Sequence, residues 1–339
     1  MKIKKNGNVL SASIIALITI AVACILILMV GTSPIKALQG FMKGILGSQY
    51  SISEVLVKMC PLLLCSIGIS VAFQTNFINI GAEGQLYVGA IAATVVGMYV
   101  NLPAALLLIV ALILGFLFGG AYSLLPGILK SKFGISEVIN TIMLNYIALG
   151  ITGILVKTVL MDDSGYFPMS PEIAASFPII LPRTRLHLGI VIALILVFII
   201  QFWLDKTQSG FNVRATGQNA RASVVAGIKI NKSILISAMV SGGFAGLAGV
   251  FEILGLQHRL MVGISSDFGY TAIIVALLAD NRPKNCIVSS LGIAALQVGS
   301  LSMQRYAGVP SSIALLIMGT IVLLHLGKEA LFPFLYEED

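Results

Sequence analysis

The sequence predicts an all-α protein that crosses a membrane about ten times. Of its 339 residues, 58% are hydrophobic and only 10% are charged, so the chain carries more apolar surface than a water-soluble core can bury. Its formal net charge is +7, but the basic residues cluster in short segments between apolar runs. That distribution orients helices in a lipid bilayer and argues against nucleic acid as a partner.

Apolar runs of about 20 residues predict the crossings, and shorter runs are allowed where a helix is broken. The first run follows the basic start MKIKKNGN without a small-x-small cleavage site, so we interpret it as an uncleaved helix. We expect spans near residues 10–30, 55–73, 86–101, 104–125, 135–160, 188–204, 233–256, 268–280, 286–304 and 311–327.

The basic residues also predict the orientation of these spans. If the N-terminus is cytoplasmic, alternate crossings place most of the 21 Lys and Arg residues on the inner side, many of them in the 205–232 loop. The largest outer loop, residues 161–187, carries Asp162, Asp163 and Glu172 instead. This asymmetry predicts ten crossings with both the N- and the C-terminus in the cytoplasm.

The run near residues 268–280 is too short for a full crossing, because about 12 helical residues cover only about 18 Å of a roughly 30 Å core. We predict a half-helix whose first turn is capped by Asp267 in SSDFGY. The stretch NFINIGAEGQ, which precedes the apolar run at Leu86, has the same construction. Broken segments in corresponding places predict an inverted repeat of two four-helix halves, residues 55–160 and 233–327.

NFINIGAEGQ places polar side chains between two apolar runs. A glutamate that faces lipid costs about 2.5 to 3.5 kcal/mol and unpaired amides add to this, so these groups should face protein or water. One interpretation is a cytoplasmic turn whose side chains cap the next helix. The other is a helix break whose residues line or brace a solute path. The residues concerned are Asn76, Asn79, Gly81, Glu83, Gly84 and Gln85.

A second polar group lies in SEVINTIMLNYIA. Glu137 and Asn140 share a helix face at i, i+3, whereas Asn145 lies about 140° from Asn140 around the helix axis. The three side chains therefore cannot all point at one spot. We expect one of them to serve the path and another to pack helices together.

The 205–232 loop contains RATGQNARASVVAGIKINK, which predicts a short helix capped by Asn219 and ended by Gly227. A helix this short needs a partner or the membrane edge to stabilise it, so it either docks on another protein or rests on lipid headgroups. Ser223 lies off its apolar stripe, where we expect an added charge to be tolerated. The stripe comprises Ala220, Val224, Val225 and Ile228.

The sequence shows no motif for chemistry on this chain. G-x-x-x-x-G-K-[ST] and G-x-S-x-G are both absent, so any ATP that drives the protein must bind another subunit. The 4 cysteines lack the paired spacing of a redox or zinc site, and the 3 histidines are far apart. We therefore expect no cofactor, no metal and no enzymatic activity on this chain.

Three motifs, in this order, resemble the permease subunits of ABC importers for simple sugars and nucleosides, a family that is also branched-chain amino acid permease-like. They are NFINIGAEGQLYVGA, TGQNARASVVAGI with its continuation SGGFAGLAG, and GYTAIIVALLADNRP. The resemblance covers residues from about 55 to 327. SEVINTIMLNYIA resembles the nucleoside branch, which includes guanosine importers.

The resemblance implies a single transmembrane permease domain, residues 1–339, in the plasma membrane of a prokaryote. It implies three kinds of partner: a second permease in a heterodimer, ATPase subunits that bind ATP and Mg on the inner side, and an outer substrate-binding lipoprotein. It also implies alternating access for a nucleoside. The family's coupling segment corresponds to Gly217, Asn219, Ala220 and Gly227.

Two alternatives remain open. A sugar importer of the ribose type would share the same family features. An ion-coupled secondary transporter with inverted repeats would need acids at mid-helix. The acids of the apolar half-repeats fall mostly near span ends, which favours ATP as the energy source; they are Glu54, Glu83, Glu137, Glu252 and Asp267.

Overall fold

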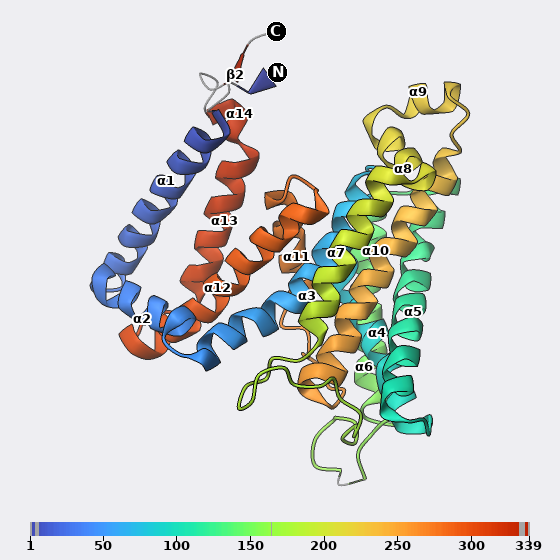
Figure 1. Cartoon of the computed structure of the whole chain (residues 1–339), viewed down its shortest axis with the longest axis horizontal. Helices are drawn as coiled ribbons and strands as arrows, with labels where there is room; N and C mark the ends of the chain where they lie inside the picture. Colours follow the sequence, from blue (N-terminus) through green and yellow to red (C-terminus); the bar gives the residue numbers. More distant parts are fainter. Residues whose placement is uncertain (1, 4–6, 164, 332–335, 338–339) are drawn as a thin grey trace. The chain divides into compact units, whose positions relative to one another are not determined.

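The structure is a computed structural model that describes residues 2–3, 7–163, 165–331 and 336–337. Helices dominate it, and the chain divides into two compact units (Figure 1). Unit 1 comprises Met1–Val55 and Leu291–Asp339, and unit 2 comprises Leu56–Ser290. The long helices α3 (Gln49–Phe73) and α12 (Pro283–Ala307) pass from one unit into the other.

Unit 1 is built on helices from both ends of the chain. Helix α1 (Gly7–Met29) and helix α2 (Pro34–Leu46) meet at an angle of 112°, and α2 packs on the end of α12, where Ser302 Oγ donates to the Gly40 carbonyl at 2.8 Å. Helix α2 was not predicted, because its polar residues and glycines interrupt the apolar pattern. The remaining elements are α13 (Ser312–Leu326), α14 (Lys328–Leu331) and the paired two-residue strands β1 (Lys2–Ile3) and β2 (Tyr336–Glu337).

Unit 2 holds the long helices, connecting segments and breaks that position the candidate site. Besides parts of α3 and α12, its elements are α4 (Ala82–Tyr99), α5 (Ala104–Phe133), α6 (Glu137–Leu155), α7 (Gly189–Lys206), α8 (Gln208–Gln218), α9 (Ala220–Val225), α10 (Ile230–Glu252), the π-helix η1 (Ile253–Gln257) and α11 (Phe268–Leu278).

Helices α3 and α10 form the centre of unit 2. Their most apolar windows are 89% and 78% buried, the second including η1, whereas those of α5, α6 and α7 are 22–33% buried. A helix that is apolar all round is buried on all sides, and a helix with an exposed apolar face suits a lipid environment. The close approach of backbones holds this centre together: a Cβ on Gly246 of α10 would lie 2.2 Å from the Gly115 carbonyl oxygen of α5.

Each predicted span coincides with a helix of the described chain, namely α1, α3 to α7 and α10 to α13. Among the described residues, six helices are long and apolar enough to cross a membrane, or up to seven if the bent pair of α1 and α2 counts as one span. Helices α11 and α13 are shorter apolar helices. The protein is therefore a helical multi-pass membrane protein, and the count of ten crossings stays a prediction.

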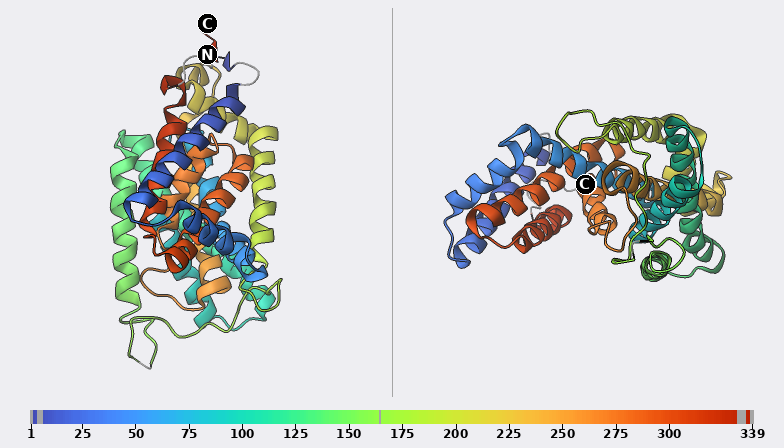
Figure 2. Two further views of the ribbon diagram at one scale, coloured as in Figure 1. Left: turned by 90° about the vertical axis from the view of Figure 1, so that its left-hand side faces the viewer. Right: turned by 90° about the horizontal axis from the view of Figure 1, so that it is seen from below.

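The connecting segments of unit 2 lie at its two ends. Helices α8 and α9 lie at one end, and the 161–187 loop lies at the opposite end, in both views (Figures 1 and 2). Two interruptions of the helical path lie elsewhere in the chain, one before the 161–187 loop and one after α9. We call residues 74–81, between α3 and α4, the first break, and residues 258–267, between η1 and α11, the second break.

Candidate functional site

The first break is held by buried amide side chains. Asn79 and Gln85 exchange two hydrogen bonds, of 2.9 Å from Asn79 Nδ2 to Gln85 Oε1 and 3.0 Å from Gln85 Nε2 to Asn79 Oδ1. Asn79 Nδ2 also donates to Ser241 Oγ of α10 at 2.8 Å, and Asn79 Oδ1 accepts from the Gly81 amide at 2.9 Å. Both side chains are buried. They face protein, as the cost of an unpaired amide in lipid requires.

Helix α6 supplies the remaining hydrogen bonds of the first break. Asn145 Oδ1 accepts from the Gly84 amide at 2.8 Å, and Asn145 Nδ2 donates to the Ile80 carbonyl at 2.9 Å and to Tyr270 Oη at 3.0 Å. Thr141 Oγ1 accepts from the Ile80 amide at 3.3 Å. The first turn of α4 is thus capped from a neighbouring helix, which differs from a simple turn that caps itself.

As predicted, the three polar side chains of α6 do not all point at one spot. Glu137 and Asn145, eight residues apart, both contact the first break, because the break runs along the buried face of α6. Asn140 lies off that face, and its Nδ2 finds no hydrogen-bond partner within the described part of the chain. The backbone of the first break, rather than helical spacing within α6, therefore decides which of these side chains contact the break.

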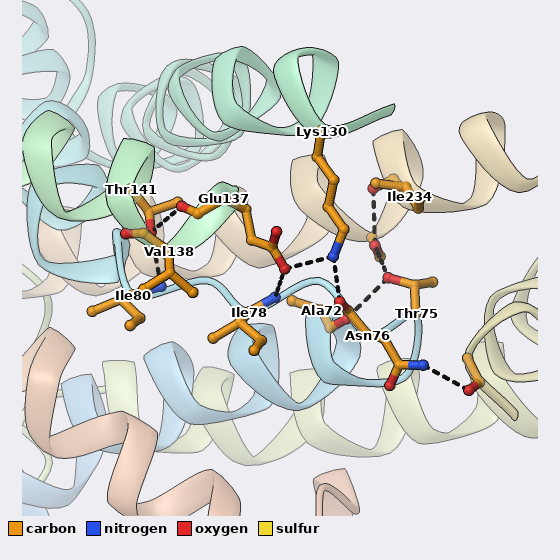
Figure 3. A network of polar contacts seen from close by, with 12 residues as sticks. Ala72, Thr75, Asn76, Ile78, Ile80, Lys130, Glu137, Val138, Thr141 and Ile234 are labelled. Atoms are coloured by element: carbon orange, nitrogen blue, oxygen red, sulfur yellow. Dashed lines mark hydrogen bonds and ion pairs between the residues drawn. The ribbon is translucent and has the colours of Figure 1, made fainter. Parts of the chain in front are cut away.

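An ion pair completes the first break, and Figure 3 shows it. Lys130, in the last turn of α5, lies 2.5 Å from Glu137 Oε1 and also donates to the carbonyl oxygen of Asn76. Glu137 Oε1 accepts from the Ile78 amide at 3.1 Å as well. Asn76 adopts a left-handed conformation, with φ of 53°. Lys130 was missed as a site residue, although a buried carboxylate such as Glu137 requires a counter-charge and Lys130 lies only seven residues before it.

Glu83 joins the first break to the half-helix α11. Its Oε2 accepts from the Gly269 amide at 2.8 Å, and a Cβ on Gly269 would lie 2.2 Å from the Glu83 nitrogen, so only glycine permits this approach. A carboxylate at a helix N-terminus satisfies a free N–H group and is favoured by the helix dipole. The side chains of the two breaks therefore meet at Glu83.

The predicted capping of α11 by Asp267 is wrong. Asp267 does occupy the N-cap position, but its φ is 62° and its side chain makes no capping hydrogen bond. Ser265 Oγ accepts from the Phe268 amide at 3.1 Å, and Glu83 accepts from the Gly269 amide. The left-handed backbone at Asp267 accounts for this, because an N-cap side chain reaches the first turn from an extended conformation.

The second break is held by the backbone of the 161–187 loop together with a few side chains, among them Ser170 Oγ and Tyr87 Oη, which accept from the Leu260 and Gly263 amides. The Ser170 amide donates to the Leu260 carbonyl, and the Ile173 amide donates to the His258 carbonyl, both at 2.9 Å. Arg259 pairs with Asp162 and with Glu172, each at 3.2 Å. Sequence reasoning missed these contacts, because nothing in a long loop shows which segment it will pair with.

Helix α9 confirms the predicted short helix of the 205–232 loop. Asn219 Oδ1 accepts from the Ala222 amide at 3.0 Å, and Gly227 follows the helix with φ of 77°. Val224 and Val225 are 59% and 90% exposed, Ala220 is exposed and Ile228 is partly buried. Ser223 is buried, and its Oγ donates to the Asn219 carbonyl at 2.9 Å. Ser223 therefore does not offer the exposed position that the sequence predicted for the milder charge substitution.

The end of α8 lies against the first break. A Cβ on Gly217 would lie 2.0 Å from the Gln74 carbonyl oxygen, so this contact also requires glycine. Asn76 Nδ2 donates to the Gly217 carbonyl at 2.8 Å. The structure thus brings together most of the predicted residues of the first break, Asn145 and Gly217, while α9 and Asn140 lie away from the contact.

The chemistry available at this site is binding and movement. Among the described residues, no group of three or more His, Cys, Asp or Glu side chains could hold a metal ion. Two interrupted helices meet inside a helical multi-pass protein, and a short helix with exposed valines lies on a connecting segment at one end. These features define a membrane transport protein of the permease class.

The chain belongs to the family described as "Branched-chain amino acid transport system / permease component", which matches residues 51–326. It is a permease subunit, a transport component and not an enzyme.

Three relatives resemble the chain over most of its length. The guanosine ABC transporter permease protein NupP of Bacillus subtilis is 36% identical over 95% of this chain and 94% of the relative. The nucleoside ABC transporter permease protein NupB of Lactococcus lactis subsp. cremoris is 32% identical over 94% and 90%. The glucose ABC transporter permease protein TsgB13 of Haloferax volcanii is 30% identical over 92% and 86%. No solved structure matches the chain.

Proposed function

We propose that this chain forms the membrane path of an ATP-driven importer of nucleosides. The observation that carries the proposal is the similarity to two permeases named for guanosine and nucleoside transport, at 36% and 32% identity over nearly the whole chain. Nucleosides pass by alternating access, in which the two breaks exchange between inward-open and outward-open arrangements.

The topology belongs to the same proposal. Ten crossings with both termini in the cytoplasm place α8 and α9 inside and the 161–187 loop outside. The helix order supports an inverted repeat of residues 55–160 and 233–327: α3, a break, α4, α5 and α6 correspond to α10 with η1, a break, α11, α12 and α13. The whole chain, residues 1–339, is then one permease domain in the plasma membrane of a prokaryote.

The partners follow from this arrangement. An ABC ATPase that carries ATP and Mg docks on α9, a second permease completes a heterodimer, and an extracellular lipoprotein delivers the substrate. Bacillus subtilis has a second guanosine ABC transporter permease protein, NupQ, which is 27% identical to this chain over 212 residues and therefore supports a pair of different permeases. This chain itself binds no cofactor.

The polar residues of the first break brace the path in this proposal. Asn79, Gln85, Asn145 and Glu83 are buried and hydrogen-bonded to protein, which suits residues that set the shape of a gate. Asn140 keeps an unused amide donor, so it is the member of the group best able to offer a hydrogen bond to a solute.

A sugar is the second candidate substrate, because a glucose permease is 30% identical over 92% of this chain. Competition distinguishes the two classes. Uptake of labelled guanosine into proteoliposomes that contain the whole transporter is measured with excess unlabelled guanosine, uridine, ribose or glucose. Uridine competing better than either sugar supports the nucleoside assignment, and competition by the sugars alone moves the assignment to sugar import.

The energy source is tested in the same vesicles. We expect uptake to require ATP hydrolysis and to survive collapse of the proton and sodium gradients. A complex whose ATPase is inactivated by mutation is the matched control. Uptake driven by an ion gradient in that control would contradict the proposal.

Docking on α9 is tested with two aspartate variants. Val224→Asp places a charge on the exposed apolar face, where an unpaired charge and a lost anchor together cost several kcal/mol in a typical interface, about 2 or more each. Ala222→Asp adds the same charge at another exposed position, about 160° around the helix. Only Val224→Asp should lose the co-purifying ATPase and the uptake. If it retains both, α9 rests on lipid and is not the coupling element.

A further inference from the structure

The end of α8 is tied to the first break by one side chain. Asn76 Nδ2 donates to the Gly217 carbonyl at 2.8 Å, and the Gly217 backbone packs directly on the carbonyl of Gln74. Gly217 is followed almost at once by Asn219, which caps α9. Only Gln218 separates Gly217 from Asn219. A displacement of α9 therefore moves Gly217 directly, and Gly217 contacts the first break.

The same part of the first break is tied to the far end of α11. Gln74 Nε2 donates to the Asn281 carbonyl at 2.8 Å, in the turn that joins α11 to α12. That turn contains two consecutive left-handed residues, Asp280 and Asn281, with φ of 49° and 55°. The half-helix α11 is thus held at both ends: Glu83 binds its N-terminus at Gly269, and Gln74 binds the turn after its C-terminus.

Helices α5, α6 and α10 hold the opposite side of the first break. Lys130 binds the Asn76 carbonyl and Glu137, and Thr75 Oγ1 lies 2.6 Å from Ser237 Oγ of α10 (Figure 3). Asn76 therefore lies between a fixed clamp on its backbone and α8 on its side chain. A residue in that position transmits a shift of α8 to the backbone of the break.

We propose that Asn76 and Gln74 are positioning residues that relay movement of α8 and α9 to the first break and to α11. The relay rests on the proposed function, because it is the ATPase on α9 that supplies the movement. Asn76 receives the displacement at Gly217, and Gln74 passes it to the α11–α12 turn. Both arms of the relay are single hydrogen bonds from a side chain to a carbonyl, so each can be removed without touching the backbone.

The test uses Asn76→Gly in the assembled transporter. Glycine accepts a positive φ without strain, so this change deletes the side-chain link and keeps the backbone. Arg183→Gly is the control for glycine at a positive φ, because Arg183 has φ of 62° and lies in the 161–187 loop, outside the relay. Gln74→Met removes the second arm at similar side-chain length.

Two measurements are made on each variant whose thermal unfolding midpoint equals that of the parent protein, so that loss of folding does not affect the result. The first is guanosine transported per ATP hydrolysed. The second needs no substrate: a cysteine placed at Ile78, which is 43% exposed, is labelled with a water-soluble maleimide in nucleotide-free and vanadate-trapped complexes, in a Cys24→Ser background. The second measurement separates failure of the relay from failure of the substrate assignment.

We expect Asn76→Gly and Gln74→Met to lower transport per ATP about tenfold, within the usual range of coupling between sites. They should also abolish the nucleotide-dependent change in labelling, while Arg183→Gly keeps both. The relay is overturned if Asn76→Gly keeps both, or if the parent protein shows no nucleotide-dependent change at position 78. If the parent protein shows the labelling change but no guanosine uptake, only the nucleoside assignment is contradicted. The labelling of the variants then tests the relay by itself.

Discussion

The two breaks of unit 2 are stabilised in different ways. Side chains from α5, α6 and α10, together with the Gly217 carbonyl of α8, hold the first break through an ion pair and several amides. The second break is held by main-chain hydrogen bonds from the 161–187 loop and by fewer side chains, those of Ser170, Tyr87 and Arg259. A break held by side chains depends on a few residue identities, whereas a break held by backbone tolerates substitution. The difference therefore predicts where mutations should be costly.

The largest effect on stability is expected at the ion pair of the first break. Lys130→Met leaves Glu137 with a mostly buried, unpaired carboxylate, and loss of one partner from such a pair costs about 3 kcal/mol. Denaturant unfolding in detergent measures this loss. The double variant Lys130→Met with Glu137→Leu should recover much of it, because no charge is then left alone. Equal stability of the single variant and the parent would remove the distinction between the breaks.

The second largest effect is expected at Asn145. Replacement by Leu leaves the Gly84 amide and the Ile80 carbonyl without their partner, and each unsatisfied buried group costs about 1 to 3 kcal/mol. We expect a loss of about 2 to 3 kcal/mol in unfolding free energy, together with reduced uptake. Asn140→Leu is the control for the stability measurement, on the same helix. A larger loss from Asn140→Leu would show that the wrong face of α6 had been assigned to the break.

At the end of unit 2 that carries the 161–187 loop, we expect stability to depend on pH through His187. His187 of the 161–187 loop is buried beside η1, where burial and the nearby charge of His258 lower its pKa to about 4 from 6.5. Between about pH 6.5 and pH 4, His187 is protonated in the unfolded chain but neutral in the folded protein. The free energy of unfolding is therefore highest above about pH 6.5 and falls as the pH drops towards 4. The expected loss is about 2 kcal/mol by pH 5.

A His187→Asn variant isolates this contribution, because all other groups titrate in both proteins. Unfolding free energies of the two proteins at pH 8 and pH 5 give the difference directly. The difference between the pH values should be smaller in the variant by about 2 kcal/mol. Identical pH profiles would mean that His187 gains a proton in the folded protein as easily as in the unfolded chain.

The smallest effect is expected at Arg259. Its partners are partly exposed, with side-chain exposures of 23% for Asp162 and 67% for Glu172, and exposed pairs contribute about 1 kcal/mol or less. Arg259→Met should therefore cost less than Lys130→Met in the same unfolding assay. If Arg259→Met were the more costly change, side chains would matter as much at the second break as at the first.

The sequence predicted the long helices because apolar run length and basic flanks are local signals. It also predicted Asn219 and Gly227 at the ends of α9, because capping depends on neighbours in the chain. It did not predict α2, whose packing on α12 compensates for a mixed composition, nor the cap of α11, which comes from Glu83 some 186 residues away in the chain. Tyr270 and Arg259 were missed for the same reason, since their partners are chosen by tertiary structure, whereas Lys130 lies only seven residues before Glu137 and had a local signal.

The long-range contacts of the first break also set the order in which the protein can be completed during synthesis. Asn76, Asn79 and Glu83 bind groups that lie 141, 162 and 186 residues further along the chain. A ribosome needs roughly 10 to 40 s to make that much chain. For that time these groups lack their long-range partners, although Asn79 can already pair with Gln85, so water must satisfy the remaining polar groups until α8, α10 and α11 arrive.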